Sequence, residues 1–250
     1  FMPGLPVYRS VDCLQWVHAG QCITTNHDFG DYPSIGSPTI RFHNGTFYVT
    51  FTDTQTMNHY IVQTKDVSGQ WTIPAMIDCG GEQISLVFDA DNNVFCTYLE
   101  NNAIAICSFI PDIGKITSQP EIIYKSGTGF HPHRPHIYMF DGQYAIVTRN
   151  AHTDNRLDVR FCLSDKITGT YESEDQHESL YDRISQHAIY VGDSLDVVNI
   201  SEGEQWMIYT VPESSSRRWN HLLPMTHIAL LQGGVSNVDE SNPLDLWEER

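Results

Sequence analysis

The sequence predicts an all-β fold, a five-bladed β-propeller with four-stranded blades, and three observations favour it. Short runs rich in Val, Ile, Thr, Phe and Tyr alternate with turn residues, and no helical period extends beyond about two turns. One hairpin pattern recurs four times along the 250 residues. Its aromatic residues recur at steps of 48, 49 and 62 residues, in the range where a repeat indicates a propeller or a solenoid.

Each copy of the hairpin consists of two apolar strands around a turn. Asn-Gly and Asp-Gly turns supply the positive φ angles that tight hairpins need. The copies, with the aromatic residues that mark equivalent points in them, are residues 38–50 with Phe47, 85–97 with Phe95, 135–147 with Tyr144 and 195–209 with Trp206. We assign these hairpins to the inner strands of the blades.

Strands of a second kind lie between the hairpins and form the outer pairs. They fall at residues 7–10, 60–64, 104–108, 159–162 and 226–230. Five outer pairs against four inner hairpins indicate that the first inner strands lie before Phe1, so that the first of five blades is incomplete. A two-sheet sandwich is the alternative, but sandwich strands rarely repeat with a period of about 50. We expect one domain at residues 1–234, with 235–250 as an exit linker or a closing edge segment.

The charge balance limits the possible partners. The chain has 14 Lys and Arg against 31 Asp and Glu, a net charge of −17, which opposes binding to nucleic acid or to an anionic membrane surface. The six cysteines show no Cys-x-x-Cys spacing, so a thiolate zinc site or a dithiol redox centre has little support. Phe1 is not an initiator methionine, and we expect an upstream segment. We expect a secreted protein, with the cytoplasm as the alternative; the oligomeric state is not defined by the sequence.

The most unusual stretch is residues 129–138, which hold three histidines, an arginine and two prolines before an apolar strand. Two prolines three residues apart cannot both lie in a central strand, so we expect a rim loop that becomes a strand near His136. Such loops often carry binding groups, although a stiff surface turn is the alternative. His131 and His133 share a face of an extended segment, and a three-histidine metal site would need a bend at Pro135. We predict no cofactor, and a cation in the central channel is left as an alternative.

Residues 1–12, Phe-Met-Pro-Gly-Leu-Pro-Val-Tyr-Arg-Ser-Val-Asp, followed by Trp16, resemble the first-blade signature of glycoside hydrolase family 43. In that family Phe-x-Pro-Gly-Leu-Pro-[Val/Ile]-Tyr-x-Ser-x-Asp is typical of β-xylosidases and α-L-arabinofuranosidases. Residues 37–49 are similar to the family's Ala-Pro-Thr-Ile-Arg-Tyr motif, and weaker matches extend to about Leu230. The resemblance implies a five-bladed propeller and a carbohydrate partner.

The resemblance also implies an inverting reaction in which an Asp acts as base, a Glu as acid and a second Asp tunes the acid. Such enzymes hold two carboxyl groups roughly 6.5–9.5 Å apart. The position of the base lies before Phe1. His133 stands at the position of the acid, because residues 131–138 align with Trp-Pro-Glu-Gly-Pro-His-Leu-Tyr. Gln83 stands at the position of the tuning Asp, because residues 83–87 align with Asp-Pro-Ser-Leu-Phe.

Four further residues are candidates for substrate binding. By the resemblance, Phe1 matches an aromatic residue that stacks on the sugar, and Gly36 replaces a Trp that precedes the second motif. His131 lies in the unusual stretch, and Arg134 could hold a uronic acid carboxylate through two hydrogen bonds. The simpler alternatives are packing beneath the first blade for Phe1 and a surface ion pair for Arg134.

We therefore expect a family 43-like protein that binds plant or microbial polysaccharide of the xylan or arabinan type, with impaired or repurposed catalysis. An imidazole at His133 can donate a proton near neutrality, but the amide of Gln83 supplies no negative charge to tune it. The first alternative is an active inverting β-xylosidase or α-L-arabinofuranosidase whose base lies on the missing upstream strand. The second is a propeller that binds proteins and no sugar.

Overall fold

The protein is described here by a computed structural model that covers residues 4–11, 15–23, 35–127, 129–140, 142–150, 159–173, 195–201, 204–209 and 229–233. Within these ranges the only regular elements are β-strands and one short 3-10 helix, η1 (Pro111–Ile113), which confirms the all-β prediction. No helix in these ranges has the length and apolar character needed to cross a membrane. The chain divides into two compact units, residues 1–186 and 187–250.

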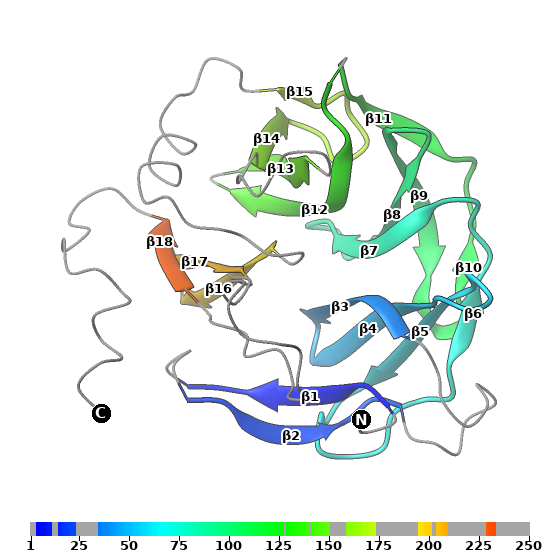
Figure 1. The fold of residues 1–250 in the computed structure, drawn as a ribbon, viewed down its shortest axis with the longest axis vertical. Helices are drawn as coiled ribbons and strands as arrows, with labels where there is room; N and C mark the ends of the chain where they lie inside the picture. Colours follow the sequence, from blue (N-terminus) through cyan, green and yellow to red (C-terminus); the bar gives the residue numbers. More distant parts are fainter. Residues whose placement is uncertain are drawn as a thin grey trace, which may run out of the picture. The chain divides into compact units, whose positions relative to one another are not determined.

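The first unit contains four antiparallel sheets among its described residues (Figure 1). The first sheet is β1 (Pro6–Arg9) and β2 (Val17–Gln21); the second is β3 (Ile35–His43), β4 (Thr46–Asp53), β5 (His59–Thr64) and β6 (Ala75–Ile77); the third is β7 (Glu82–Phe88), β8 (Val94–Glu100) and β9 (Ala103–Ile110), with β10 (Lys115–Ile116) and β11 (Glu121–Lys125) both paired to β9; the fourth is β12 (Pro132–Phe140), β13 (Gln143–Asn150), β14 (Val159–Ser164) and β15 (Glu172–Ser173).

The second unit contains one described sheet. Its strands are β16 (Leu195–Ser201), β17 (Glu204–Tyr209) and β18 (Ala229–Gly233), in that order. All four predicted inner hairpins are therefore present, as β3–β4, β7–β8, β12–β13 and β16–β17. Residues 235–250 lie outside the described ranges, and one domain over residues 1–234 stays a prediction.

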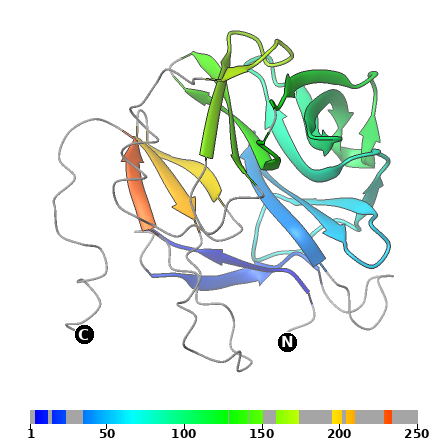
Figure 2. The same ribbon diagram turned by 45° about the horizontal axis from the view of Figure 1, so that its top comes forward.

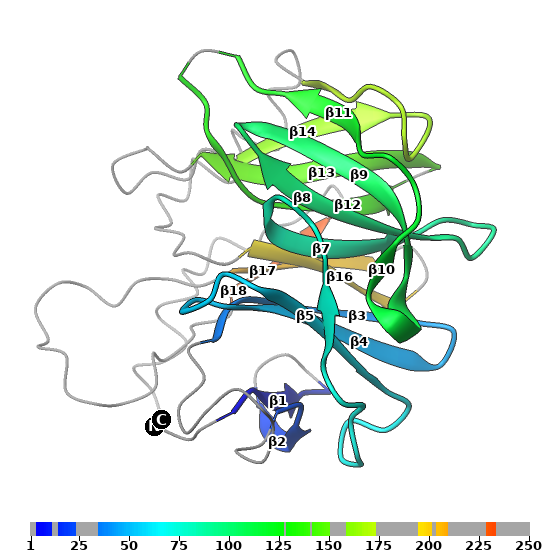
Figure 3. The ribbon, with the colours of Figure 1, turned by 90° about the vertical axis from the view of Figure 1, so that its right-hand side faces the viewer.

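In the second, third and fourth sheets of the first unit, the first strand lies beside the first strand of the neighbouring sheet. β7 contacts both β3 and β12, and Figure 2 shows the second, third and fourth sheets following one another in chain order. Figure 3 shows the same sheets as stacked layers. Consecutive meander sheets that meet through their first strands are what a blade arrangement requires.

The core of the first unit consists of three apolar layers, each between two neighbouring sheets. The layer between the third and fourth sheets includes Ile104, Ile106 and Ile146, and none of these side chains exceeds 1% exposure. Equivalent layers lie between the second and third sheets and between the first and second sheets. Since burying one such side chain stabilises a fold by roughly 1.5–3 kcal/mol, these layers fix how the sheets stack.

The turns of the inner hairpins differ in length. The β3–β4 turn is the two-residue Asn44-Gly45, with φ angles of 47° and 75°. The β7–β8 connection is longer, and the carboxylate of Asp89 accepts hydrogen bonds from the backbone N–H groups of Asp91 and Asn93 at 2.9 and 2.8 Å. Because of this loop, Phe95 pairs with Val87 and Val94 pairs with Phe88.

The aromatic markers of the second, third and fourth sheets each form the second strand pair from the turn. Phe47 pairs with Phe42, Tyr144 pairs with Met139, and Phe95 pairs with Val87. Counted from the turn, the predicted equivalence of Phe95 with Phe47 and Tyr144 is therefore confirmed, although the loop before Phe95 is longer.

Candidate functional site

The first strands of the second, third and fourth sheets each contain a β-bulge at the same place. Pairing with the neighbouring strand shifts between Gly36 and Thr39, between Glu82 and Ser85, and between His133 and His136. One residue in each bulge has a positive φ: 47° at Ser37, 57° at Gln83 and 50° at Arg134. Bulges leave a residue out of the ladder and re-aim side chains, and they are frequent beside active sites.

The bulge in β12 explains how a strand accommodates two prolines. Pro132 is the first residue of β12, and Pro135 lies in the bulge, so neither has to donate a ladder hydrogen bond. The prediction of a loop as far as His136 is wrong, because the strand already begins at Pro132.

The bulges of the third and fourth sheets are in direct contact. The side-chain Oε1 of Gln83 accepts a hydrogen bond from the backbone N–H of Arg134. The backbone of His133 is held from the other side, because its N–H donates to Oγ1 of Thr148 at 3.1 Å and its carbonyl lies 3.2 Å from the same hydroxyl. The structure thus brings together Gln83, His133 and Arg134, three of the residues predicted from sequence.

A polar network beneath the bulges links the same three strands. Ser85 lies at its centre: its Oγ forms a 2.9 Å hydrogen bond with Nδ1 of His136 and accepts a 3.4 Å hydrogen bond from Nη2 of Arg41. The guanidinium of Arg41 also lies 5.5 Å from the ring centroid of Tyr138. Sequence reasoning did not single out Arg41 or Ser85. Their signal is the two-residue alternation of each strand, which places them on one face with His136.

A carboxylate that the sequence did not single out, Glu82, lies directly before Gln83. Glu82 is exposed and occupies the same place relative to its bulge as His133. Nearby, Nε2 of the buried His59 lies 2.8 Å from the carbonyl of Gly81. Burial lowers the pKa of His59, and the Gly81 carbonyl and the negative charge of Glu82 act in the opposite direction. The equivalence of Glu82 with His133 becomes visible only when the bulges are aligned.

The remaining substrate-binding candidates have different surroundings. Nδ1 of His131 lies 3.2 Å from Oδ1 of Asn102, at the rim of a surface hollow. At Gly36 a Cβ atom would lie 2.6 Å from Cγ2 of Thr54, so this methyl group fills the space where a side chain would begin. Phe1 lies outside the described residues.

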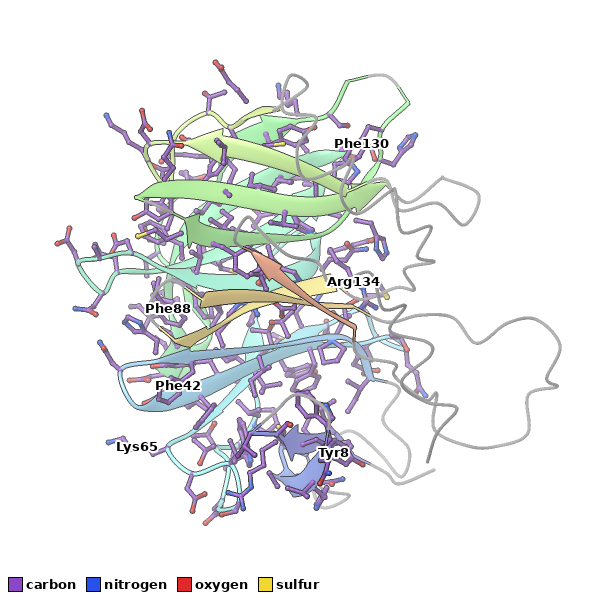
Figure 4. All side chains as sticks on the ribbon, turned by 90° about the vertical axis from the view of Figure 1, so that its left-hand side faces the viewer. Tyr8, Phe42, Lys65, Phe88, Phe130 and Arg134 are labelled. Carbon is purple, nitrogen blue, oxygen red and sulfur yellow. The ribbon has the colours of Figure 1, made fainter. Side chains whose placement is uncertain are left out.

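Arg134 and Phe130 lie toward the same end of the strands in the first unit, whereas Phe42 and Phe88 lie toward the opposite end (Figure 4). The bulges therefore open on one face of this unit, and the inner hairpin turns lie on the other. Among the described residues, no three His, Cys, Asp or Glu side chains are grouped so that they could hold a metal ion. Within the described ranges, the chemistry at the bulges comes from amide, imidazole, guanidinium and hydroxyl groups and from the single carboxylate of Glu82.

Comparison with known proteins gives a family match over most of the chain. The model of Glycosyl hydrolases family 43 matches residues 1–232. The chain is 23% identical over 239 residues to the non-reducing end α-L-arabinofuranosidase BoGH43B of Bacteroides ovatus, which covers 92% of this chain and 45% of that protein. It is 22% identical over 196 residues to a β-xylosidase of Bacillus subtilis, and the match covers 69% of this chain and 36% of that protein. The chain thus spans less than half the length of these relatives.

Solved structures share the fold. A GH43B structure from a xyloglucan locus of Bacteroides ovatus has a TM-score of 0.69 at 22% identity and covers 86% of this chain and 45% of that chain. An endo-arabinase structure from Bacteroides thetaiotaomicron has a TM-score of 0.68 at 16% identity and covers 93% of this chain and 86% of that chain. The described sheets therefore have a β-propeller fold.

Proposed function

Because the chain belongs to glycosyl hydrolases family 43, we propose that it binds a plant or microbial polysaccharide of the xylan or arabinan type, with hydrolysis impaired or repurposed. The observation that carries this proposal is the chemistry of the joined bulges. Gln83, His133 and Arg134 supply an amide, an imidazole and a guanidinium. An inverting reaction needs two carboxyl groups across the sugar instead.

Gln83 and Arg134 fit binding better than hydrolysis. The Gln83 side chain already accepts the N–H of Arg134, and an amide carries no charge that would raise the pKa of a neighbouring acid. Arg134 brings a permanent positive charge, which favours hydroxyl and carboxylate groups of a sugar over a protonated catalytic acid. Since general acid catalysis is worth about 10²–10⁴ in rate, a site without a tuned acid retains little glycosidase activity.

The test compares binding and hydrolysis by the same protein. Binding to xylan and arabinan is measured by affinity electrophoresis, and turnover of aryl β-xylosides and α-L-arabinofuranosides is measured from pH 4 to pH 8. We expect polysaccharide binding that weakens in Arg134→Ala and turnover close to the uncatalysed rate. The exposed His18 on β2 provides a matched control, His18→Ala, for the variant His133→Ala. Turnover that disappears only in His133→Ala would make His133 an unusual acid, and an absence of glycan binding would overturn the proposal.

A second candidate is an active inverting glycosidase with its base on an upstream strand, and one observation favours it. The first described sheet has two strands, whereas the second and fourth have four. On β3, Ile40 and Phe42 are 41% and 60% exposed. An inner hairpin added to the first sheet would cover the exposed side chains of Ile40 and Phe42. It would also complete the first blade of the five-bladed ring that we propose. Intact mass and N-terminal sequencing of the natural protein test this, because a mature start at Phe1 removes the strand.

The third candidate, a propeller that binds proteins and no sugar, predicts a flat response on a glycan array. For the main proposal we place the protein outside the cell, where these polysaccharides occur, and cell fractionation tests that placement. The net charge of −17 argues against nucleic acid as a partner.

A further inference from the structure

We propose a second carbohydrate site, apart from the bulges, in a hollow between the β8–β9 turn and the β11–β12 connection. The inference rests on the proposed function and deepens it, since the ligand is a neutral, hydroxyl-rich sugar unit of the same polysaccharide. The hollow has a volume of about 750 Å³, within the roughly 300–1,000 Å³ of small-molecule sites. The lining residues used below are Glu100, Asn101, Asn102, Ile122, Lys125 and His131.

The two walls of the hollow are fastened to each other by Asn102. Its backbone carbonyl accepts hydrogen bonds from Oγ and N of Ser126, at 3.1 and 3.4 Å. Its side-chain Oδ1 lies 3.2 Å from Nδ1 of His131. One residue of the β8–β9 turn therefore holds the segment after β11 at two points. A hollow whose walls are fixed before binding costs less conformational entropy when a ligand enters.

Three polar side chains in the hollow are available to a ligand. The side chains of Glu100, Asn101 and Lys125 form no hydrogen bond or ion pair with another of the described residues. They supply an acceptor, a mixed amide group and a donor, respectively. A sugar hydroxyl both donates and accepts, so it matches such a mixture.

The charges and the apolar surface favour a neutral sugar. Glu100 and Lys125 have opposite charges, so the hollow offers no net attraction to a phosphate or a polyanion. Ile122 lines the hollow and is 43% exposed, so its side chain offers an apolar surface to the C–H face of a sugar ring.

The hollow lies close enough to the bulges for one chain of sugars to reach both. His131 lines the hollow, and His133 borders the bulge two residues later. Two residues of extended chain span about 7 Å. An oligosaccharide held at Arg134 can therefore continue past His131 into the hollow, so that affinity should increase with chain length.

The experiment measures affinity by calorimetry for xylo- and arabino-oligosaccharides from one to six units. The variants are Asn101→Gly and Lys125→Ala. Residue 101 has a φ of 50°, and glycine adopts this angle without strain, so Asn101→Gly removes the side chain and keeps the turn. The matched controls are Asn92→Gly, at a φ of 65° in the β7–β8 loop, and Lys115→Ala on β10. Thermal unfolding confirms that each variant is folded.

In the wild type we expect affinity to increase with length. Each hollow variant should weaken binding of the hexasaccharide roughly three- to tenfold, as expected for one hydrogen bond, and should bind the monosaccharide with wild-type affinity. Both control variants should bind the hexasaccharide with wild-type affinity. If the wild type binds the hexasaccharide no better than the monosaccharide, or both hollow variants bind it like the wild type, the second site is overturned while the proposed function stands. If the wild type binds no member of either series, the proposed function fails with it.

Discussion

Replacing Ser85 by Ala is the sharpest test of the network beneath the bulges. Ser85 is 1% exposed, and its hydroxyl is shared by Nδ1 of His136 and Nη2 of Arg41, at 2.9 and 3.4 Å. The substitution removes one oxygen atom and leaves the packing volume almost unchanged. His136 is 7% exposed, so water does not readily replace the lost partner.

The cost follows from this burial. Depriving a buried polar group of its hydrogen bond costs about 1–3 kcal/mol, and we expect about 2 kcal/mol for Ser85→Ala. For a chain of this size that lowers the melting temperature by roughly 4–8 °C. The control is Ser108→Ala on β9, in the same sheet, where the hydroxyl makes no hydrogen bond to the described residues and the change should cost less than about 0.5 kcal/mol.

Urea denaturation followed by tryptophan fluorescence gives both free energies. The double variant Ser85→Ala with Arg41→Gln should be less destabilised than the sum of the single variants, because both remove the same hydrogen bond. Equal stability of Ser85→Ala and Ser108→Ala would refute the claim that this network holds the inner strands together.

Four further predictions use other parts of the first unit. Thr148→Val should cost about 1–3 kcal/mol in urea denaturation and weaken glycan binding, because Thr148 is fully buried and holds the backbone of His133; wild-type affinity would contradict this. Gln83→Leu should destabilise the fold by a similar amount, because the N–H of Arg134 loses its acceptor, whereas Gln63→Leu, which removes an exposed hydrogen bond to Asp112, should not. Burial lowers the pKa of His59, so the unfolded chain binds its proton first and stability falls as the pH drops below 6.5; His59→Gln should make this fall shallower in denaturation curves at pH 7, 6 and 5. Burial raises the pKa of Cys22 to about 12 and that of Cys79 to about 11, so mass spectrometry after iodoacetamide treatment at pH 8 should find both thiols unmodified until the protein unfolds.

Local patterns were sufficient to predict where the strands lie. The runs around Phe47 and Tyr144, each beside a two-residue turn, specify their hairpins because alternation and turn chemistry act over a few residues. The length of the β7–β8 loop was not predictable in this way, since a turn held by an Asp side chain has no simple signature. The family was also accessible, because long motifs near the start of the chain resemble those of family 43.

The arrangement of the candidate site was predicted only in part, and the roles of His133 and Gln83 stay predictions. The hydrogen bond between Gln83 and Arg134 joins residues 51 positions apart, and no local rule determines such a pairing. The bulges were missed because positive φ angles at Ser37, Gln83 and Arg134 depend on the neighbouring strand. The hollow beside His131 was missed for the same reason: its walls come from two loops whose proximity exists only after folding.

The repeated bulges separate the architecture from the chemistry that it displays. At each of them one residue leaves the ladder and contributes nothing to strand pairing, so a different polar side chain there changes the exposed chemistry while the pairing of the strands is kept. The same strand pairing therefore presents a hydroxyl at Ser37, an amide at Gln83 and a guanidinium at Arg134.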